Sequence, residues 1–190
     1  MKNNYITSIN ENIKIHKKLA SLENKINQSI DKIYNTIASG GKIFTCGNGG
    51  SAADAQHLAA EYLIRLRPNK NRKAYPMISL ALDTSTLTAC GNDIGFNSIF
   101  SRNLSALGSK KDLLIAISTS GNSKNIINVL KQAKKMKIFS IALLGSKGGN
   151  AKKYTDLSLV VPSNNVARIQ EAHIFLGHYI LEKTEDLLIK

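Results

Sequence analysis

The apolar residues of the chain repeat with a helical period near its N-terminus and form short continuous runs further along. Between residues 22 and 37 they recur every three or four positions, which predicts a helix with one apolar stripe. A second helix is expected just before it, over residues 6–20, and Gly40-Gly41 should end the pair. The chain therefore opens with two helices, which together occupy residues 1–40.

Five short apolar runs follow, each of a length typical of a buried strand. They lie at residues 42–46, 76–82, 112–118, 138–145 and 157–162. Helical patterns separate them, at residues 51–66, 85–93, 97–108, 123–136 and 166–188. Strands that are apolar throughout and alternate with helices form a parallel sheet covered on both faces. We expect one α/β domain over residues 1–190, with a doubly wound five-stranded parallel sheet and an N-terminal helical extension.

Composition and charge argue against several kinds of binding partner. No apolar run is long enough for a transmembrane helix, and the N-terminus is too polar for a signal peptide. Two cysteines without a CxxC motif favour a reducing, cytoplasmic setting. The net charge is +13, but the basic stretches at 65–73 and 131–137 accompany no nucleic-acid motif. We interpret them as solvated surface and expect neither a nucleic acid nor a membrane as partner.

Polar loops follow the first three expected strands, at the edge where doubly wound sheets bind their ligands. The loop "STSGNS" (118–123) offers hydroxyls and free amides at the start of a helix, which suits a phosphate monoester. The alternative is that Ser123 is an ordinary helix N-cap. The loop "GNGGS" (47–51) is also polar and lets a ligand approach the backbone. Two such loops side by side favour a phosphate-sized polar site.

The helix after the first loop carries His57 and Glu61, one turn apart on one face. This spacing allows both side chains to bind one metal ion, although a surface His–Glu pair has the same pattern. The last helix holds His173 and His178 among apolar residues, and we assign His173 to the core. Arg65, one turn beyond Glu61, faces either the same cleft or solvent.

Taken together, four segments resemble the phosphoheptose isomerases, which have the sugar isomerase (SIS) fold. They are "CGNGGSAADAQHLAAEYLIR", "TACGNDIGFNSIFSR", "AISTSGNS" and "RIQEAHIFLGH". They occur in the family's order from about Gly41 to the end, and the combination of His57, Glu61, "RIQE" and His178 is its most specific part. The resemblance implies a flavodoxin-like SIS sheet. It also implies interconversion of sedoheptulose 7-phosphate and D-glycero-D-manno-heptose 7-phosphate, which supplies heptose for lipooligosaccharide, lipopolysaccharide or capsule.

The resemblance further implies roles for single residues. Glu61 is the expected base and His178 the expected acid, and one zinc ion per active site would be held by His57, Glu61, Gln170 and His178. The implied substrate contacts are Asn48, Gly49, Gly50, Ser51, Glu61, Arg65, Asn92, Asp93, Ser118, Thr119, Ser120, Ser123 and Gln170. The four hydroxyl residues between 118 and 123 would hold the phosphate.

These residue types suit the reaction. Moving a carbonyl between C1 and C2 takes a proton from one carbon and returns one to its neighbour through an enediolate. A carboxylate can take the carbon proton, and an imidazole can carry the oxygen proton because it titrates near neutrality. Zinc would stabilise the enediolate oxygens. Because a carboxylate bound to zinc is a weaker base, the two roles of Glu61 would belong to different moments of the cycle.

The spacing of Gln170 and His178 bears on assembly. Eight residues span about 12 Å along a helix, whereas zinc ligand bonds are about 2.0–2.2 Å long. If both residues are ligands, they come most simply from different chains. We therefore expect a homo-oligomer, a tetramer with active sites at subunit interfaces and residues 1–40 used in oligomerisation. The alternative is that only one of the two binds metal and the site lies within one chain.

The sequence is also compatible with a second function. A non-catalytic SIS-fold protein that binds the replication initiator would share the phosphate loops and the helical N-terminus. Such a scaffold has no need for a base at position 61 and an acid at position 178, and the chain has both. This observation favours the enzyme.

Overall fold

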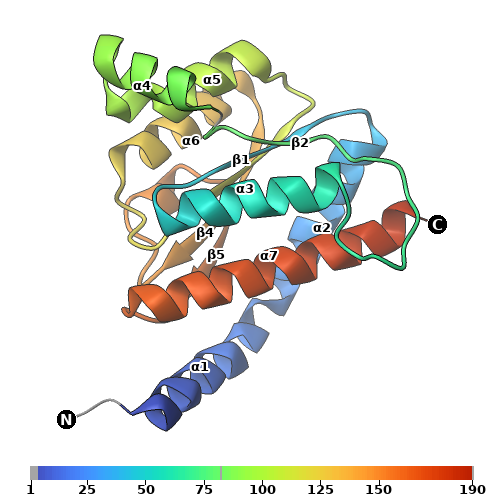
Figure 1. The fold of residues 1–190 in the computed structure, drawn as a ribbon, viewed down its shortest axis with the longest axis vertical. Coiled ribbons are helices and arrows are strands. Elements are labelled where there is room, and N and C mark those ends of the chain that lie inside the picture. Colours follow the sequence, from blue (N-terminus) through green and yellow to red (C-terminus); the bar gives the residue numbers. More distant parts are fainter. Residues whose placement is uncertain (1–3, 82, 190) are drawn as a thin grey trace.

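The structure is a computed structural model that describes residues 4–81 and 83–189 (Figure 1). The main elements in chain order are α1 (Tyr5–Leu19), α2 (Glu23–Ala38), β1 (Ile43–Cys46), α3 (Gly50–Leu63), β2 (Met77–Ser79), α4 (Thr84–Asp93), α5 (Ile99–Leu107), β3 (Leu113–Ser118), α6 (Lys124–Met136), β4 (Phe139–Gly145), β5 (Leu157–Val161) and α7 (Val166–Leu188). Short 3₁₀ turns occur at Ala20–Leu22, Phe96–Ser98 and Ala151–Lys153. The expected alternation of strands and helices is confirmed, with every expected element present.

The five strands form one parallel sheet in the order β2-β1-β3-β4-β5. This is the flavodoxin-like order, in which the strand sequence reverses between β1 and β3. The second strand was expected over residues 76–82 but ends at Ser79. The Leu80 N–H still donates to Thr45 O, and the Leu80 side chain is fully buried. After Ser79 the chain leaves the sheet, and the Leu80 side chain packs into the core instead of continuing the strand. Residue 82 lies outside the described residues.

Alternate strand residues supply two separate cores, because successive side chains point to opposite faces of a sheet. Ile43 and Ile115 belong to the core under α2, α3 and α7. Phe44 and Leu114 belong to the core under α5 and α6, which α4 joins through Cys90. The sheet is thus covered on both faces, as its apolar strands predict.

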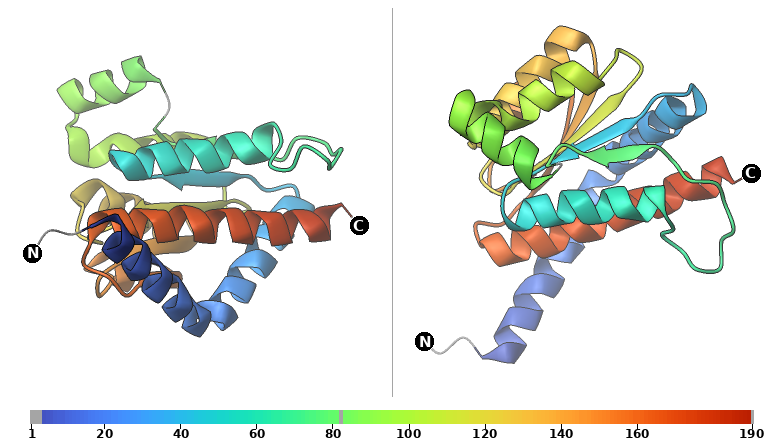
Figure 2. Two further views of the ribbon diagram at one scale, coloured as in Figure 1. Left: turned by 60° about the horizontal axis from the view of Figure 1, so that its bottom comes forward. Right: turned by 45° about the horizontal axis from the view of Figure 1, so that its top comes forward.

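Helices α3 and α7 lie side by side and run in the same direction on one face of the sheet (Figures 1 and 2). A Cβ on Gly177 would lie 2.7 Å from Leu58 Cδ1, so glycine at this position lets α3 pack closely onto α7. Further along, the Tyr62 hydroxyl donates to Leu181 O at 2.9 Å. These contacts fix which residues of the two helices stand opposite each other.

The N-terminal helices meet at an elbow over Ala20–Leu22, and α1 projects beyond the sheet (Figure 2, left). The start of α1 is tied to α7, since Arg168 donates to Ser8 O at 3.0 Å and Asn12 to Glu171 Oε2 at 2.6 Å. Helix α1 also carries exposed apolar residues at the helical spacing Ile6, Ile9 and Ile13. Of these, Ile9 and Ile13 line a cavity with Arg168 and Glu171 of α7. No helix among the described residues combines the length and the hydropathy that crossing a bilayer requires.

Candidate functional site

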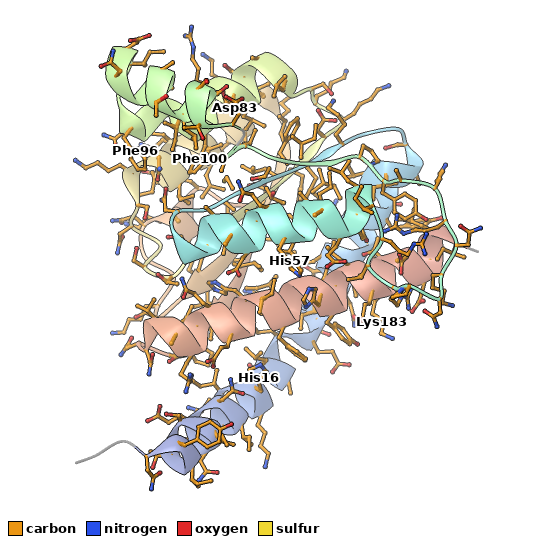
Figure 3. All side chains as sticks on the ribbon, viewed as in Figure 1. His16, His57, Asp83, Phe96, Phe100 and Lys183 are labelled. Atoms are coloured by element: carbon orange, nitrogen blue, oxygen red, sulfur yellow. The ribbon has the colours of Figure 1, made fainter. Side chains whose placement is uncertain are left out.

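Three potential metal ligands converge between α3 and α7. His57 Nε2 lies 2.9 Å from His178 Nε2 and 3.3 Å from Glu61 Oε1, and the ligand atoms of the three residues all lie within 4.8 Å of one another. Figure 3 shows His57 on the side of α3 that faces α7. The spacing indicated the His57–Glu61 pair and the family resemblance implied His178, and the fold brings His178 to the pair from a helix more than a hundred residues away.

The parallel packing of the two helices produces this cluster. Residues one turn apart share a helix face, so His57 and Glu61 point the same way. Leu58, next to His57, packs against Gly177, next to His178, and this contact sets the two helices in register. The His57 side chain is 48% exposed, so the outer side of the cluster is open.

The donor set fits a catalytic zinc site. Zinc takes imidazole nitrogen and carboxylate oxygen at about 2.0–2.2 Å, and catalytic sites leave a coordination position open for substrate or water. Two imidazoles and one carboxylate within 4.8 Å of one another, with one side open to solvent, provide such a set.

Asp54 lies one turn before His57 on α3, and the sequence analysis did not select it. Its Oδ2 is buried and has no hydrogen-bond partner among the described residues. Burial raises the pKa of Asp54, while the nearby His57 and His178 partly oppose this shift. The i, i+3 spacing to His57 was the available signal. Asp54 thus adds a second carboxyl group to the electrostatics of the cluster.

Gln170 lies apart from this cluster. A Cβ on Gly50 would lie 2.5 Å from Gln170 Nε2, so the Gln170 amide packs against the first residue of α3. From Gly50 to His57 the rise along the helix is about 10 Å. Gln170 and His178 of one chain therefore lie opposite different turns of α3. This agrees with the eight residues that separate them along α7.

The loop from 118 to 123 follows β3 and leads into α6. The Ser118 hydroxyl accepts from the Gly121 N–H, and the Ser120 hydroxyl accepts from the Asn122 N–H, both at 3.1 Å. Ser123 occupies the N-cap position of α6, but its side chain makes no capping hydrogen bond. The alternative of Ser123 as the helix N-cap is thus confirmed for its backbone position, while its side chain is not used for capping. Its hydroxyl remains available to a ligand at a helix N-terminus.

The two polar loops are linked by a pair of amides. Asn48 and Asn125 donate to each other's side-chain oxygens at 2.9 and 2.8 Å, which joins the end of β1 to the first turn of α6. Gly49 adopts a positive φ of 57°, which favours glycine at this turn, and Ser51 is buried in the first turn of α3. Asn125 was missed by the sequence analysis, since an asparagine in a helix carries no distinctive spacing.

Three expected substrate residues lie outside these contacts. Asn92 and Asp93 are exposed in the last turn of α4, where the Asn92 amide donates to Asp93 Oδ1 at 2.7 Å. Arg65 is exposed and bonds only weakly to Pro68 O, at 3.4 Å. Within the described part of the chain, no hydrogen bond joins these three side chains to the cluster or to the loop at 118–123.

His173 is a core residue, as its sequence context predicts. It is fully buried, and burial lowers its pKa to about 4. The backbone of Leu144 lies near enough to oppose part of this shift, although neither ring nitrogen has a hydrogen bond of normal geometry among the described residues. His173 is therefore neutral near pH 7 and takes no part in the exposed cluster.

Comparisons with known proteins agree with this architecture. The sequence profile of the SIS domain family matches residues 4–145. The chain is 51% identical over 157 residues to a phosphoheptose isomerase of Chlorobaculum parvum, which covers 82% of this chain and 75% of that protein. It is 45% identical over 184 residues to one of Campylobacter concisus, at 95% and 96% coverage. The solved phosphoheptose isomerase GmhA from Neisseria gonorrhoeae superposes with a TM-score of 0.89 at 38% identity, over 95% of this chain and 96% of that one.

Proposed function

The chain belongs to the phosphoheptose isomerases of the SIS domain family and is a sugar-phosphate isomerase, and on this premise we propose that it interconverts sedoheptulose 7-phosphate and D-glycero-D-manno-heptose 7-phosphate. The observation that carries the proposal is the convergence of a carboxylate and two imidazoles at His57, Glu61 and His178. The non-catalytic alternative has no use for such a cluster.

The proton transfers can be assigned to two side chains. Glu61 takes the C1 proton of the ketose and returns a proton to C2, which converts the ketose to the aldose. His178 donates a proton to O2 and accepts the one that leaves O1. Each group thus ends the cycle in its starting state. An imidazole suits the oxygen transfer because it both gives and takes a proton near neutral pH.

A zinc ion at this cluster is part of the proposal. His57, Glu61 and His178 would hold it, and Gln170 would complete the set from a second chain. When bound, the ion supplies a positive charge that favours negative charge on the C1 and C2 oxygens. Two imidazoles and a carboxylate with an open outer side support this assignment.

The phosphate is proposed to bind at the loop from 118 to 123, through the hydroxyls of Ser118, Thr119, Ser120 and Ser123 and through backbone amides. The N-terminus of α6 and the Ser123 hydroxyl, which makes no capping hydrogen bond, support this placement. Asn48, Gly49, Gly50 and Ser51 would line the neighbouring loop. Arg65, Asn92 and Asp93 would reach the sugar only through movement or from another chain.

We also propose that the active form is a homotetramer with sites shared between chains. The exposed apolar side of α1, with Ile9 and Ile13, and the exposed aromatic rings of Phe175 and Tyr179 on α7 support an interface there. His178 adjoins Tyr179 in the sequence but faces His57 on α3, whereas Phe175 and Tyr179 line a groove with α1 and α2. A partner chain that covers the two rings would therefore approach the cluster from the neighbouring side of α7. Residues 1–40 would act in assembly within a single SIS domain of residues 1–190.

Sizing coupled to light scattering tests the assembly, with turnover measured on the same fractions. Ile9→Asp combined with Ile13→Asp should dissociate the oligomer and abolish turnover, because two charges replace buried apolar contacts. Leu107→Asp, at an exposed leucine on α5, is the matched control and should do neither. An active monomer would contradict the shared site.

Turnover of sedoheptulose 7-phosphate by the purified protein tests the reaction itself. Formation of the aldose is expected, and hexose and pentose phosphates should be turned over more slowly. The product's place in lipooligosaccharide, lipopolysaccharide or capsule synthesis, in the cytoplasm, is part of the same proposal. Failure to convert the heptose phosphate, with conversion of a shorter sugar phosphate, would reassign the substrate.

A further inference from the structure

The segment that joins α3 to β2 is not the solvated basic loop that its sequence suggests. It carries Arg67 and Arg72, and the Arg72 side chain is only 2% exposed. Its partner Glu185, near the end of α7, is fully buried. A buried arginine needs a specific set of partners, because charge is costly to remove from water. The interpretation of residues 65–73 as solvated surface is therefore wrong at Arg72.

The Arg72 guanidinium donates hydrogen bonds both to the end of α3 and to Glu185 of α7. Nη2 donates to Glu61 O at 2.8 Å, and Nη1 donates to Tyr62 O at 3.0 Å and to Lys73 O at 2.9 Å. Nε donates to Glu185 Oε1. The guanidinium carbon also lies 4.6 Å from the centre of the Tyr75 ring. One side chain thus contacts both the turn that carries Glu61 and the last turns of α7.

These hydrogen bonds satisfy the backbone carbonyls at the end of α3. The Ile64 N–H donates to Ala60 O, and the helix, which was expected to continue to residue 66, stops at Leu63. The carbonyls of Glu61 and Tyr62 then need donors from outside the helix. Arg72 supplies them, together with the Tyr75 N–H, which donates to Tyr62 O at 3.0 Å. A positive charge here also complements the negative end of the helix dipole.

The other half of the contact lies on the helix that carries His178. Glu185 is seven residues beyond His178, about two turns or 10 Å further along α7. Between them, Leu181 O accepts from the Tyr62 hydroxyl. The Arg72–Glu185 pair therefore connects the Glu61 turn of α3 to α7, at the end of the helix pair that lies beyond the cluster.

We propose that Arg72 and Glu185 are positioning residues, which hold the Glu61 turn of α3 at a fixed distance from His178 on α7. The proposal rests on the proposed function for the roles of Glu61 and His178. Neither positioning residue touches the substrate. They act through the Glu61 backbone, so their loss should affect the chemical step and metal binding more than binding of the phosphate.

A purely structural role is the competing explanation, and a suitable control exists. Arg67 shares the same partner, since it pairs with Glu185 and Asp186, but its side-chain hydrogen bonds within the described residues go to α7 alone. Arg67→Gln therefore removes an arginine from Glu185 without removing a donor from Glu61. Arg72→Gln removes both the arginine beside Glu185 and the donor to Glu61 O.

The experiment compares Arg72→Gln with Arg67→Gln by three measurements: kcat and KM for the heptose phosphate, Co²⁺ affinity of the metal-free protein, and thermal unfolding. Loss of residues that orient metal ligands typically costs about 10–100-fold in metal affinity or activity. We expect this loss in kcat and in Co²⁺ affinity for Arg72→Gln, with KM changed by less than about threefold, because the loop at 118–123 stays intact. Arg67→Gln should keep kcat and Co²⁺ affinity within about threefold of the wild type.

A double variant distinguishes the effect of losing the hydrogen bond to Glu61 O from the effect of losing stability. Arg72→Met with Glu185→Leu replaces the buried pair by apolar groups, a change that often preserves folding. It should unfold near the wild-type temperature yet keep the reduced kcat and Co²⁺ affinity, since Glu61 O still lacks its donor. Wild-type kcat and affinity in this variant, or equal losses in Arg72→Gln and Arg67→Gln, would overturn the proposal. If the wild type does not convert the heptose phosphate, the proposed function fails, whereas the Co²⁺ titration still decides on Arg72.

Discussion

The helix pair α3–α7 and the loops at the carboxyl edge of the sheet hold their polar side chains in different ways. Between the helices, His57, Glu61 and His178 already meet within 4.8 Å in a single chain. In the loop at 118–123, Ser118 and Ser120 bond to their own turn. The groups that we propose to react are thus already close together on the packed helices, whereas we expect the loop side chains to gather around a bound ligand.

Packing explains the difference. A helix buried against a sheet and a neighbouring helix has one position, and Leu58 against Gly177 and Tyr62 against Leu181 fix it here. Exposed loops have fewer such contacts, so their side chains satisfy hydrogen bonds locally. The reciprocal pair of Asn48 and Asn125 is the main side-chain link between the two loops.

The largest effect should come from the helix pair. Glu61→Gln and His178→Gln each keep the size of the side chain but remove its acid–base function, and loss of a positioned acid or base typically costs about 10²–10⁴-fold in rate. Steady-state kinetics should show this fall in kcat, with the fold intact by circular dichroism. Near wild-type turnover by Glu61→Gln would refute the proposed mechanism. It would also mean that the helix pair α3–α7 is no more important for turnover than the loop at 118–123.

A further prediction tests whether acid weakens the core beneath the helix pair. The pKa of His173 is about 4 in the folded protein and about 6.5 when unfolded, so the unfolded chain binds a proton first as the pH falls. This contribution to stability is complete above pH 6.5 and is lost between about pH 6.5 and 4, a change of about 3 kcal/mol.

Urea unfolding at several pH values measures this loss. The variant His173→Gln, which cannot titrate, is the control, and its free energy of unfolding should fall less steeply than that of the wild type from pH 6.5 to 5. Parallel curves for the two proteins would show that His173 does not carry the dependence.

The smallest effect is expected at the loops, where several donors share one ligand. Ser120→Ala should raise KM for the heptose phosphate about tenfold, since a hydrogen bond to a charged group contributes about 1.5–3 kcal/mol. Its kcat should stay within about twofold, because the reacting carbons lie elsewhere. Ser105→Ala, at an exposed serine of α5 that bonds to Arg102 O, is the control. A phosphate bound away from residues 118–123 in a ligand complex would contradict this prediction.

Predictions from the sequence were most accurate where periodicity is strong. The apolar runs predicted all five strands, and the i, i+4 spacing predicted that His57 and Glu61 share a face. The pattern could not give the end of β2, because Leu80 continues the apolar run while packing into the core instead of extending the strand. It also predicted a solvated loop at 65–73, since the sequence of a basic stretch does not tell which arginine finds a buried acid.

The sequence alone determined the order of the elements, the parallel sheet and the two faces of its strands, since these depend on periodicity along the chain. It also carried the local pairs, such as His57 with Glu61. The resemblance named His178 as a further ligand, but only the tertiary structure decided that it meets the pair within one chain while Gln170 stands beside Gly50. Only the tertiary structure, too, decided that Arg72 binds Glu61 O and Glu185 together. These contacts join residues up to 121 positions apart. Their geometry depends on how one helix packs beside another, and no local pattern records it.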